Sequence, residues 1–354
     1  MVSVLAMNKF LPHITYVDEA FAKEIPTNPL AFLRQLTGLT IFDVKGVDKT
    51  RTRVITTLIH GNEPSGMIAL HQWLLAKVIP AVNIRFVICN PEAANLLPEF
   101  SHRYLHAAQD LNRFFDLKKE SDSGIHRRAK QIMDAVSEVN PEAIIDLHNT
   151  SGSSPAFGVS ISDSDKVLDL ISLFTNKVIL TGLNVGAIME QDFSAPIVTI
   201  ECGGATELFS HQIAIDGINR FTNREVIFDH HAAQVDIHRF PCRVELKQDV
   251  TLGFGDYALL TADITVRTDI EKLNNQLTAA GELIGWYNKN NELPLTAKDE
   301  QGAEQLCNLL TLQNGCIYTK QSLQLFMATT KLDIANNDCL FYATIESSFF
   351  HDKS

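Results

Sequence analysis

His60 and Glu63 are the residues whose types and spacing point most directly to chemistry. They lie in the stretch 58–64, and the apolar run 54–59 predicts a short buried strand that ends at His60. A histidine and a carboxylate three residues apart, on the turn that leaves a strand, can face one metal ion. Zinc accepts both ligand types, and a hydrolytic zinc site needs three protein ligands and an open position for water. The pair therefore predicts a metal site whose third ligand must come from another part of the chain.

His148 is the candidate third ligand. The apolar run 143–147 predicts a strand that ends at this histidine, close to the strand of the first motif. Asp146 lies two residues upstream on the same side of that strand, where it can accept the imidazole N–H that does not face the metal. The alternative is a structural histidine, which is the commoner role of a single histidine at a strand end. The spacing to Asp146 favours the ligand.

Glu201 is the candidate general base. It follows the apolar run 197–200, and a carboxylate that leaves a buried strand is costly unless it has a partner or a function. Beside a zinc ion, which lowers the pKa of its bound water to about 7, the carboxylate could take a proton from that water. The alternative is a helix N-cap or a salt bridge with the helix that follows.

Arg103, Asn112 and Arg113 are the candidates for holding a substrate. The Asn-Arg pair could fix a carboxylate, since Arg binds it by a two-pronged fork and Asn by its amide N–H. Arg103 could polarise a scissile carbonyl and stabilise the oxyanion that develops there. Asp110 is interpreted as an orienting partner for an arginine. The alternative for each arginine alone is a solvated side chain in a loop.

Alternating strands and helices must position these residues. The predicted strands are 39–44, 54–59, 82–89, 143–147, 178–180 and 197–200, and the predicted helices are 29–36, 66–78, 124–139, 167–177 and 205–228. This alternation is typical of a mainly parallel sheet that is covered by helices on both faces. Ligands bind such sheets beyond the carboxyl ends of the strands. His60, Asn90, His148 and Glu201 fall at four such strand ends.

The sequence pattern changes near residue 240. From there on, helical periodicity is weak, and short apolar runs alternate with turns that contain Gly, Asn and Asp. These runs are 244–246, 258–260, 264–266, 325–327 and 340–343. We therefore predict an α/β catalytic domain over residues 1–240 and a smaller, mostly-β C-terminal domain over residues 241–354.

The net charge and the cysteine content limit the expected binding partners and the expected cellular compartment. The 354 residues carry a net charge of −12, which argues against a nucleic-acid partner because phosphate binding needs a basic face. No run reaches the roughly 18 apolar residues of a membrane span. The N-terminus lacks a signal-peptide pattern, and the six cysteines are scattered without a CxxC pair. A reduced, cytoplasmic protein is expected, and a homo-oligomer remains compatible with the sequence.

Four motifs in order resemble the succinylglutamate desuccinylase/aspartoacylase family of zinc enzymes with a carboxypeptidase A-like fold. They are His-Gly-Asn-Glu at 60–63, Asp-Leu-Asn-Arg at 110–113, Asp-Leu-His-Asn-Thr at 146–150 and Ile-Glu-Cys-Gly at 200–203. The match covers about residues 50–230. The resemblance implies a mixed, mainly parallel sheet flanked by helices, with a smaller C-terminal mostly-β domain that narrows the channel to the metal.

The same resemblance implies roles for individual residues. His60, Glu63 and His148 would bind one Zn²⁺ per chain, and Glu201 would be the general base. Asn112 and Arg113 would bind the α-carboxylate of an N-acyl amino acid, and Arg103 would polarise the amide carbonyl. The stretch 183–190 lacks the Tyr and Arg with which the aspartoacylase branch grips a second carboxylate, so specificity for N-acetylaspartate is not implied.

The leading interpretation is therefore a zinc-dependent amidohydrolase that deacylates a small anionic N-acyl amino acid or a similar amide. A zinc carboxypeptidase acting on a peptide is the first alternative, because the same residues would serve it. The second alternative is a zinc-binding interaction protein without catalytic activity.

Overall fold

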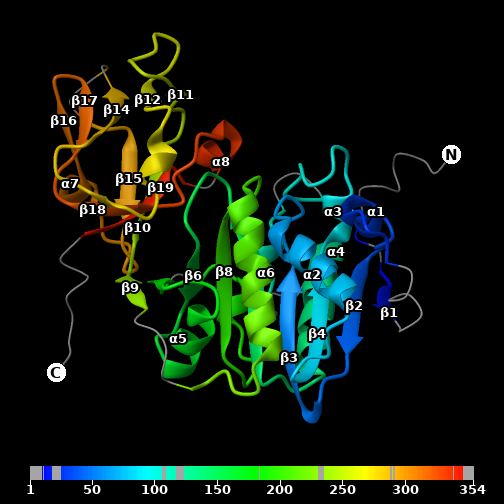
Figure 1. Cartoon of the computed structure of the whole chain (residues 1–354). Coiled ribbons are helices and arrows are strands. Elements are labelled where there is room, and N and C mark those ends of the chain that lie inside the picture. The colour runs from blue at the N-terminus through cyan, green and yellow to red at the C-terminus, as the bar shows by residue number, and fades with distance from the viewer. Residues whose placement is uncertain are drawn as a thin grey trace. The chain divides into compact units, whose positions relative to one another are not determined.

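The computed structural model describes residues 10, 12–17, 25–105, 109–116, 123–182, 184–229, 235–287, 289, 292–337 and 339–345. The chain forms two compact units (Figure 1). The first comprises residues 1–149, 156–177 and 184–235, and the second comprises 150–155, 178–183 and 236–354. The boundary that the sequence predicts between residues 240 and 241 stays a prediction.

A nine-stranded sheet carries the motifs. In spatial order its strands are β1 (Ile14–Val17), β2 (Leu39–Val44), β4 (Val82–Ile88), β3 (Asp48–Thr57), β5 (Ala143–Thr150), β8 (Ile197–Gly204), β6 (Phe157–Ser160), β7 (Lys177–Leu180) and β9 (Asp236–Arg239). β3 pairs in parallel with β4 and β5, whereas β2/β4 and β6/β8 are antiparallel. The predicted mixed, mainly parallel sheet is thus confirmed.

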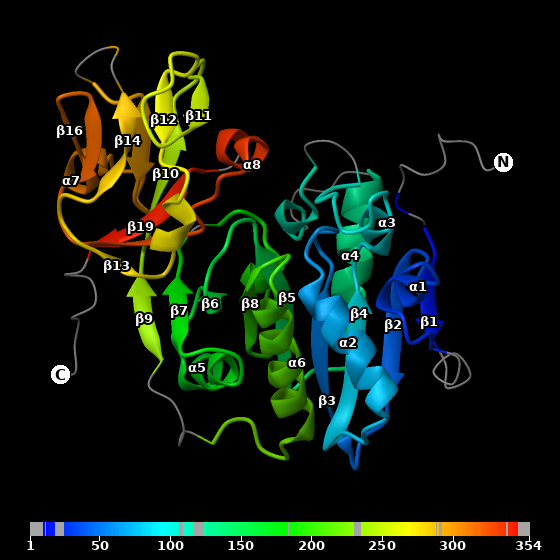
Figure 2. The ribbon, with the colours of Figure 1, turned by 45° about the horizontal axis from the view of Figure 1, so that its top comes forward.

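Helices cover both faces of this sheet. Adjacent residues of a strand point to opposite sides, so a strand that is apolar throughout needs a packing partner on each side. Phe86 of β4 meets Trp73 of α2 (Ser65–Ala76), with ring centroids 5.2 Å apart. Its neighbour Val87 belongs instead to the core that includes Ile125 and Ile132 of α4 (Gly124–Ser137). α6 (Leu208–Asn223) packs beside α2 (Figure 2).

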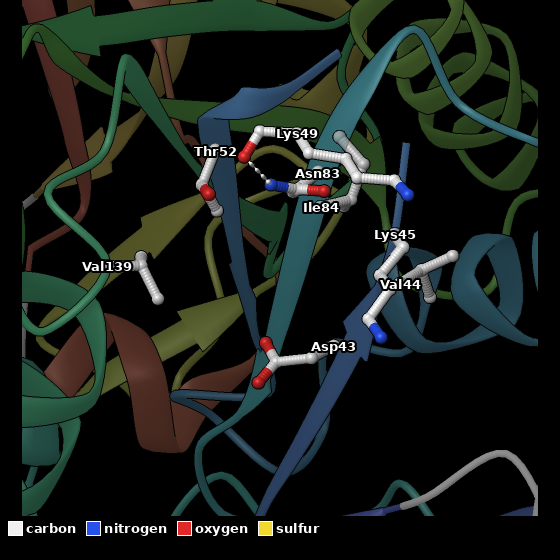
Figure 3. A pocket seen from close by; sticks show the side chains of 8 residues that line it. All are labelled: Asp43, Val44, Lys45, Lys49, Thr52, Asn83, Ile84 and Val139. Carbon is white, nitrogen blue, oxygen red and sulfur yellow. Dashed lines mark hydrogen bonds between the residues drawn. The ribbon is translucent and has the colours of Figure 1, made fainter. Parts of the chain in front are cut away.

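The shorter helices of the first unit connect the strands. They are α1 (Pro29–Leu33), α3 (Pro91–Ala94), η3 (Leu111–Arg113), α5 (Asp165–Ser172) and η4 (Ile188–Glu190). None of the helices formed by the described residues combines the length and the apolar character that a membrane span needs. A cavity of about 290 Å³ lies along β2, β3 and β4 and includes none of the predicted site residues (Figure 3).

Two predicted strands extend further than their apolar runs. β5 continues to Thr150 and β8 to Gly204, so His148 and Glu201 lie inside strands rather than just after them. Both strands sit in the interior of the sheet order, and a neighbour on each side satisfies the backbone of polar residues as well as apolar ones. Strands β1, β6 and β9 were not predicted from the sequence.

The second unit consists mainly of two five-stranded sheets, in the orders β13-β18-β19-β10-β15 and β11-β12-β14-β17-β16. The strands are β10 (Cys242–Leu246), β11 (Leu252–Phe254), β12 (Ile264–Val266), β13 (Leu277–Thr278), β14 (Leu283–Tyr287), β15 (Leu295–Lys298), β16 (Leu310–Gln313), β17 (Cys316–Thr319), β18 (Leu323–Phe326) and β19 (Phe341–Ile345). Apart from β11/β12, the neighbouring strands in these two sheets pair in antiparallel fashion.

Three short helices join these strands, and one apolar core serves both sheets. The helices are η5 (Ile270–Leu273), α7 (Leu306–Leu309) and α8 (Leu332–Asn337). The core includes Val244 of β10, Ile264 of β12 and Ile317 of β17, all buried. The mostly-β character predicted for this part of the chain is therefore observed, although the run 258–260 is not a strand.

Candidate metal centre

His60, Glu63 and His148 converge as one buried triad. The Nδ1 atom of His60 lies 2.9 Å from Glu63 Oε1, and the Nδ1 atom of His148 lies 2.7 Å from Glu63 Oε2. The two Nδ1 atoms are 3.2 Å apart. β3 and β5 are paired neighbours, so the strand that precedes His60 and the strand that carries His148 bring the two motifs together.

The loop between β3 and α2 reaches the triad by a sharp turn. Leu58, directly after β3, has a φ of 54°, in the left-handed region. Gly61 then passes so close to α3 that a Cβ atom on it would lie 2.6 Å from the backbone of Ala93. The Gly61 N–H donates to the Arg103 carbonyl oxygen at 3.1 Å. Glycine at position 61 is therefore a packing requirement of the first motif.

Each imidazole of the triad has a carboxylate behind it. His148 Nε2 lies 2.7 Å from Asp146 Oδ2, which confirms the partnership that the spacing predicted. His60 Nε2 lies 2.7 Å from Asp110 Oδ1. The prediction paired Asp110 with an arginine, and Asp110 does lie 3.6 Å from Arg103 Nη2. Its bond to His60 was missed, because fifty residues separate the two and no periodic pattern links them.

Asp146 is fully buried and is stabilised by three polar neighbours. Besides His148, the hydroxyl of Thr56 donates to Oδ1 at 2.6 Å and the hydroxyl of Thr199 donates to Oδ2 at 3.2 Å. Thr56 lies on β3 and Thr199 on β8, the two neighbours of β5. The carboxylate therefore connects three strands while it fixes the ring of His148.

The triad fits a metal ion. With each Nε2–H donating to its carboxylate, the neutral form of each ring turns an Nδ1 lone pair inward, as metal ligation requires. Nitrogen ligands at ordinary zinc distances in a tetrahedron lie about 3.3 Å apart, and the two Nδ1 atoms are separated by 3.2 Å. The donor set of two imidazoles and one carboxylate is that of a catalytic zinc site.

Charges around the triad perturb its pKa values. Burial alone would raise the pKa of Glu63, but His60, His148 and Arg103 together hold it well below the usual range. Burial would likewise lower the pKa of His148, but Asp146 and Glu63 outweigh it and raise that pKa well above normal. Protons and a metal cation therefore compete for the same inward-facing atoms.

Glu201 is buried on β8, and its Oε2 atom has no hydrogen-bond partner within the part of the chain that the structure describes. Burial raises its pKa to about 7, and the charge of Glu63 adds to this, while His148 and Arg103 act in the opposite direction. The predicted alternative of a helix cap does not hold, because Glu207 occupies the N-cap position of α6.

Arg103 points into the triad. Its Nη1 atom donates to Glu63 Oε1 at 2.6 Å, and its Nε atom donates to the Tyr104 hydroxyl at 3.1 Å. Its pKa is raised: burial opposes this, but the carboxylates of Glu63 and Asp110 outweigh burial. The alternative of a solvated loop side chain does not apply to Arg103, which is 17% exposed.

Asn112 and Arg113 lie in η3 and differ in accessibility. Asn112 is buried, and its Oδ1 atom accepts the Ile188 N–H at 3.0 Å. Arg113 keeps 39% of its side chain exposed, with Nη2 4.0 Å from Asp110 Oδ2. Gly186, at a φ of 84°, lies against the Arg113 carbonyl, where a Cβ atom would approach to 2.7 Å. Glycine at 186 thus lets η3 sit close to the chain that precedes β8.

Comparisons with known proteins identify a family model and similar folds. Residues 49–223 match the family model described as the succinylglutamate desuccinylase/aspartoacylase catalytic domain. The structure is similar to a succinylglutamate desuccinylase from Vibrio parahaemolyticus, with 15% identity, a TM-score of 0.57, and coverage of 90% of this chain and 94% of that chain.

Two further solved structures share the fold. For the succinylglutamate desuccinylase from Vibrio cholerae, identity is 19%, the TM-score is 0.53, and coverage is 80% of this chain and 86% of that chain. For murine aminoacylase 3 the identity is 17%, the TM-score 0.50, and the coverage 84% and 95%. At such identities the likeness concerns the fold alone. A comparison with curated proteins gave no match.

Proposed function

Because the chain belongs to the succinylglutamate desuccinylase/aspartoacylase family, we propose that it is a zinc-dependent amidohydrolase that removes the acyl group from a small N-acyl amino acid. The observation that carries the proposal is the buried triad of His60, Glu63 and His148, with Glu201 buried nearby. Two oriented imidazoles, a ligand carboxylate and a second carboxylate are the parts that metal-assisted hydrolysis needs.

The triad would hold one Zn²⁺ through His60 Nδ1, His148 Nδ1 and the Glu63 carboxylate. When bound, zinc acidifies water and polarises a carbonyl group. Asp110 and Asp146 keep the two imidazoles in the tautomer that leaves Nδ1 free. Both imidazole ligands would therefore be oriented by a neighbouring carboxylate and not by the metal alone.

Glu201 would take the proton of the attacking water and pass it to the amine that leaves. Burial raises the pKa of Glu201 to about 7 in the metal-free protein, and a bound cation would lower it, so that the carboxylate would be ionised and able to accept a proton from water. Its Oε2 atom has no described partner, so no hydrogen bond has to break before the proton moves.

Arg113 and Asn112 would bind the α-carboxylate of the substrate. Arg113 is partly exposed and can offer its guanidinium fork. The amide oxygen of Asn112 is engaged by the Ile188 N–H, so its NH₂ group is the end left to donate to a carboxylate. Arg103, which is held in place by Tyr104 and Glu63, would polarise the amide carbonyl.

Metal analysis combined with a substrate screen tests the proposal. The purified protein should contain about one zinc per chain and should hydrolyse at least one compound in a panel of N-succinyl, N-acetyl and N-formyl amino acids. His148→Ala should lose both the metal and the activity, whereas His102→Ala, which removes an exposed histidine from the Arg103 loop, should lose neither. Cleavage of C-terminal peptide bonds with no deacylation would support a carboxypeptidase instead. Protein without any divalent metal would refute the proposal.

A further inference from the structure

Asn149 follows the ligand His148 directly in β5, and adjacent strand residues point to opposite faces. Its side chain therefore turns away from the face of His148 and Asp146. We propose that Asn149 is a positioning residue that fixes the ligand Glu63 and the base Glu201 relative to each other. The inference rests on the proposed function, because it assigns a role within that site.

The amide of Asn149 is buried and makes a hydrogen bond with every polar atom it has. Its Oδ1 atom accepts the Ser65 N–H at 3.0 Å. Its Nδ2 atom donates to Ser65 Oγ at 2.8 Å and to the Gly203 carbonyl oxygen at 2.8 Å. Both donors and the acceptor of one side chain are thus engaged with two segments that lie far apart in the sequence.

The two segments that Asn149 joins are those that carry the other functional carboxylates. Ser65 begins α2, two residues after Glu63, and Gly203 lies on β8, two residues after Glu201. In addition, the backbone N–H of Asn149 donates to Glu63 Oε2 at 3.3 Å. One residue therefore contacts the ligand carboxylate directly and ties the base strand to the ligand loop.

The network continues from Ser65 to α6. Because Ser65 Oγ accepts a hydrogen bond from Asn149, its own proton is free to be donated to His211 Nδ1, 2.8 Å away. Ser65 is fully buried and its bonds with Asn149 form away from water, whereas the bond to the half-buried His211 is only partly shielded. Buried polar networks of this kind are rigid only when every member is satisfied, and Asn149 is the member with the most partners.

The geometry requires an amide at position 149. Aspartate has the same shape but only accepts hydrogen bonds at neutral pH, so Asn149→Asp would face the Gly203 carbonyl oxygen with a second acceptor. The buried Ser65 hydroxyl and the Gly203 carbonyl would lose their donor. A shift of about 1 Å in a catalytic group costs on the order of 100-fold in rate, which sets the scale of the expected effect.

A matched control separates positioning from stability alone. Asn95 is also an amide that clamps backbone, with Nδ2 3.1 Å from the Leu33 carbonyl oxygen and 3.4 Å from that of Leu36. Neither of these hydrogen bonds involves a residue of the triad. Asn95→Asp should lower the unfolding temperature but leave kcat, KM and zinc affinity at the wild-type values.

The experiment compares Asn149→Asp and Asn95→Asp in three measurements: zinc affinity by chelator competition, kcat and KM on the zinc-loaded enzyme, and unfolding of the metal-free protein. For Asn149→Asp we expect zinc affinity to fall by about 10- to 100-fold, kcat to fall by at least about 10-fold, and KM to change by less than about 3-fold. Wild-type zinc affinity and kcat in Asn149→Asp, with only a lower unfolding temperature, would overturn the inference.

A second variant covers the case in which Asn149→Asp does not fold. Ser65→Ala removes one of the three side-chain bonds of Asn149 and keeps the one to Gly203. It should lower zinc affinity and kcat in the same direction by a smaller factor, and wild-type values would overturn the inference. If wild-type protein binds zinc but hydrolyses no amide, while Asn149→Asp still weakens zinc binding, the proposed function fails and the positioning role stands.

Discussion

Replacing Glu201 by Gln should make the metal-free protein more stable while it removes activity. In the unfolded chain the carboxyl group loses its proton near its ordinary pKa of 4.5, whereas burial raises the pKa in the folded protein to about 7. Between these values the folded state binds more protons, so the free energy of unfolding falls as pH rises through this range. A pKa difference of this size corresponds to about 3 kcal/mol.

The full difference in the free energy of unfolding applies above pH 7, where the folded wild type must hold a buried negative charge. At pH 8, Glu201→Gln should therefore have a free energy of unfolding higher than wild type by up to about 3 kcal/mol. The two proteins should converge near pH 4, because Glu201 is then protonated in both states of the wild type. Denaturant unfolding of chelator-treated protein at pH 4, 6 and 8 measures this difference.

Activity should move in the opposite direction. On the zinc-loaded enzyme, loss of the general base should lower kcat by about 10²- to 10⁴-fold, with zinc still bound. Glu63→Gln is a control for which the change in stability should have the opposite sign. His60, His148 and Arg103 hold the pKa of Glu63 low, so its replacement should lower the free energy of unfolding of the metal-free protein at pH 8. A Glu201→Gln protein that is less stable than wild type at pH 8, or equally active, would refute the reasoning.

Four further changes test other parts of the structure. Asp146→Asn should weaken zinc binding by about 10- to 100-fold, because it alters the partner of His148 Nε2; chelator competition measures this. Gly61→Ala should abolish metal binding or folding, since its Cβ would lie 2.6 Å from the α3 backbone; metal content and circular dichroism decide. Zinc affinity should fall steeply from pH 8 to pH 6, because protons compete with zinc for His148, whose pKa is raised. Zinc titrations at each pH test whether the affinity falls as the pH is lowered. Asn274→Ala should lower the free energy of unfolding by about 2–4 kcal/mol, because the buried Asn274 side chain loses one hydrogen bond to the Ser153 carbonyl oxygen and two to the backbone of Ala328; denaturant unfolding measures this change.

Local pattern was sufficient to predict six of the nine strands of the large sheet and the residues that form the triad. The apolar runs before His60 and His148 correspond to strands that pair directly, and alternation along β5 places Asp146 and His148 on one side. These features depend only on period and on residue type. They can therefore be predicted from the sequence without knowledge of tertiary contacts.

What the sequence could not supply were contacts between distant segments. Asp110 supports His60 across fifty residues, and Thr56 and Thr199 meet at Asp146 from two strands. Asn149 belongs to a motif that the sequence marks, yet its partners Ser65 and Gly203 follow only from the order β3-β5-β8 in the sheet. Such bonds depend on topology, which no single-segment pattern encodes.

The distribution of charge explains why the centre is built to receive a cation. Four carboxylates, those of Glu63, Asp110, Asp146 and Glu201, lie around two imidazoles and Arg103. Without a metal, His148 is driven to hold a proton and Glu201 is driven to hold one as well. A divalent cation would remove both needs at once, because it replaces the proton on the imidazole and lowers the pKa of the neighbouring carboxyl group. The same buried negative charge that would destabilise the empty site would thus provide affinity for a metal ion and would leave Glu201 ionised, as the proposed role of a base requires.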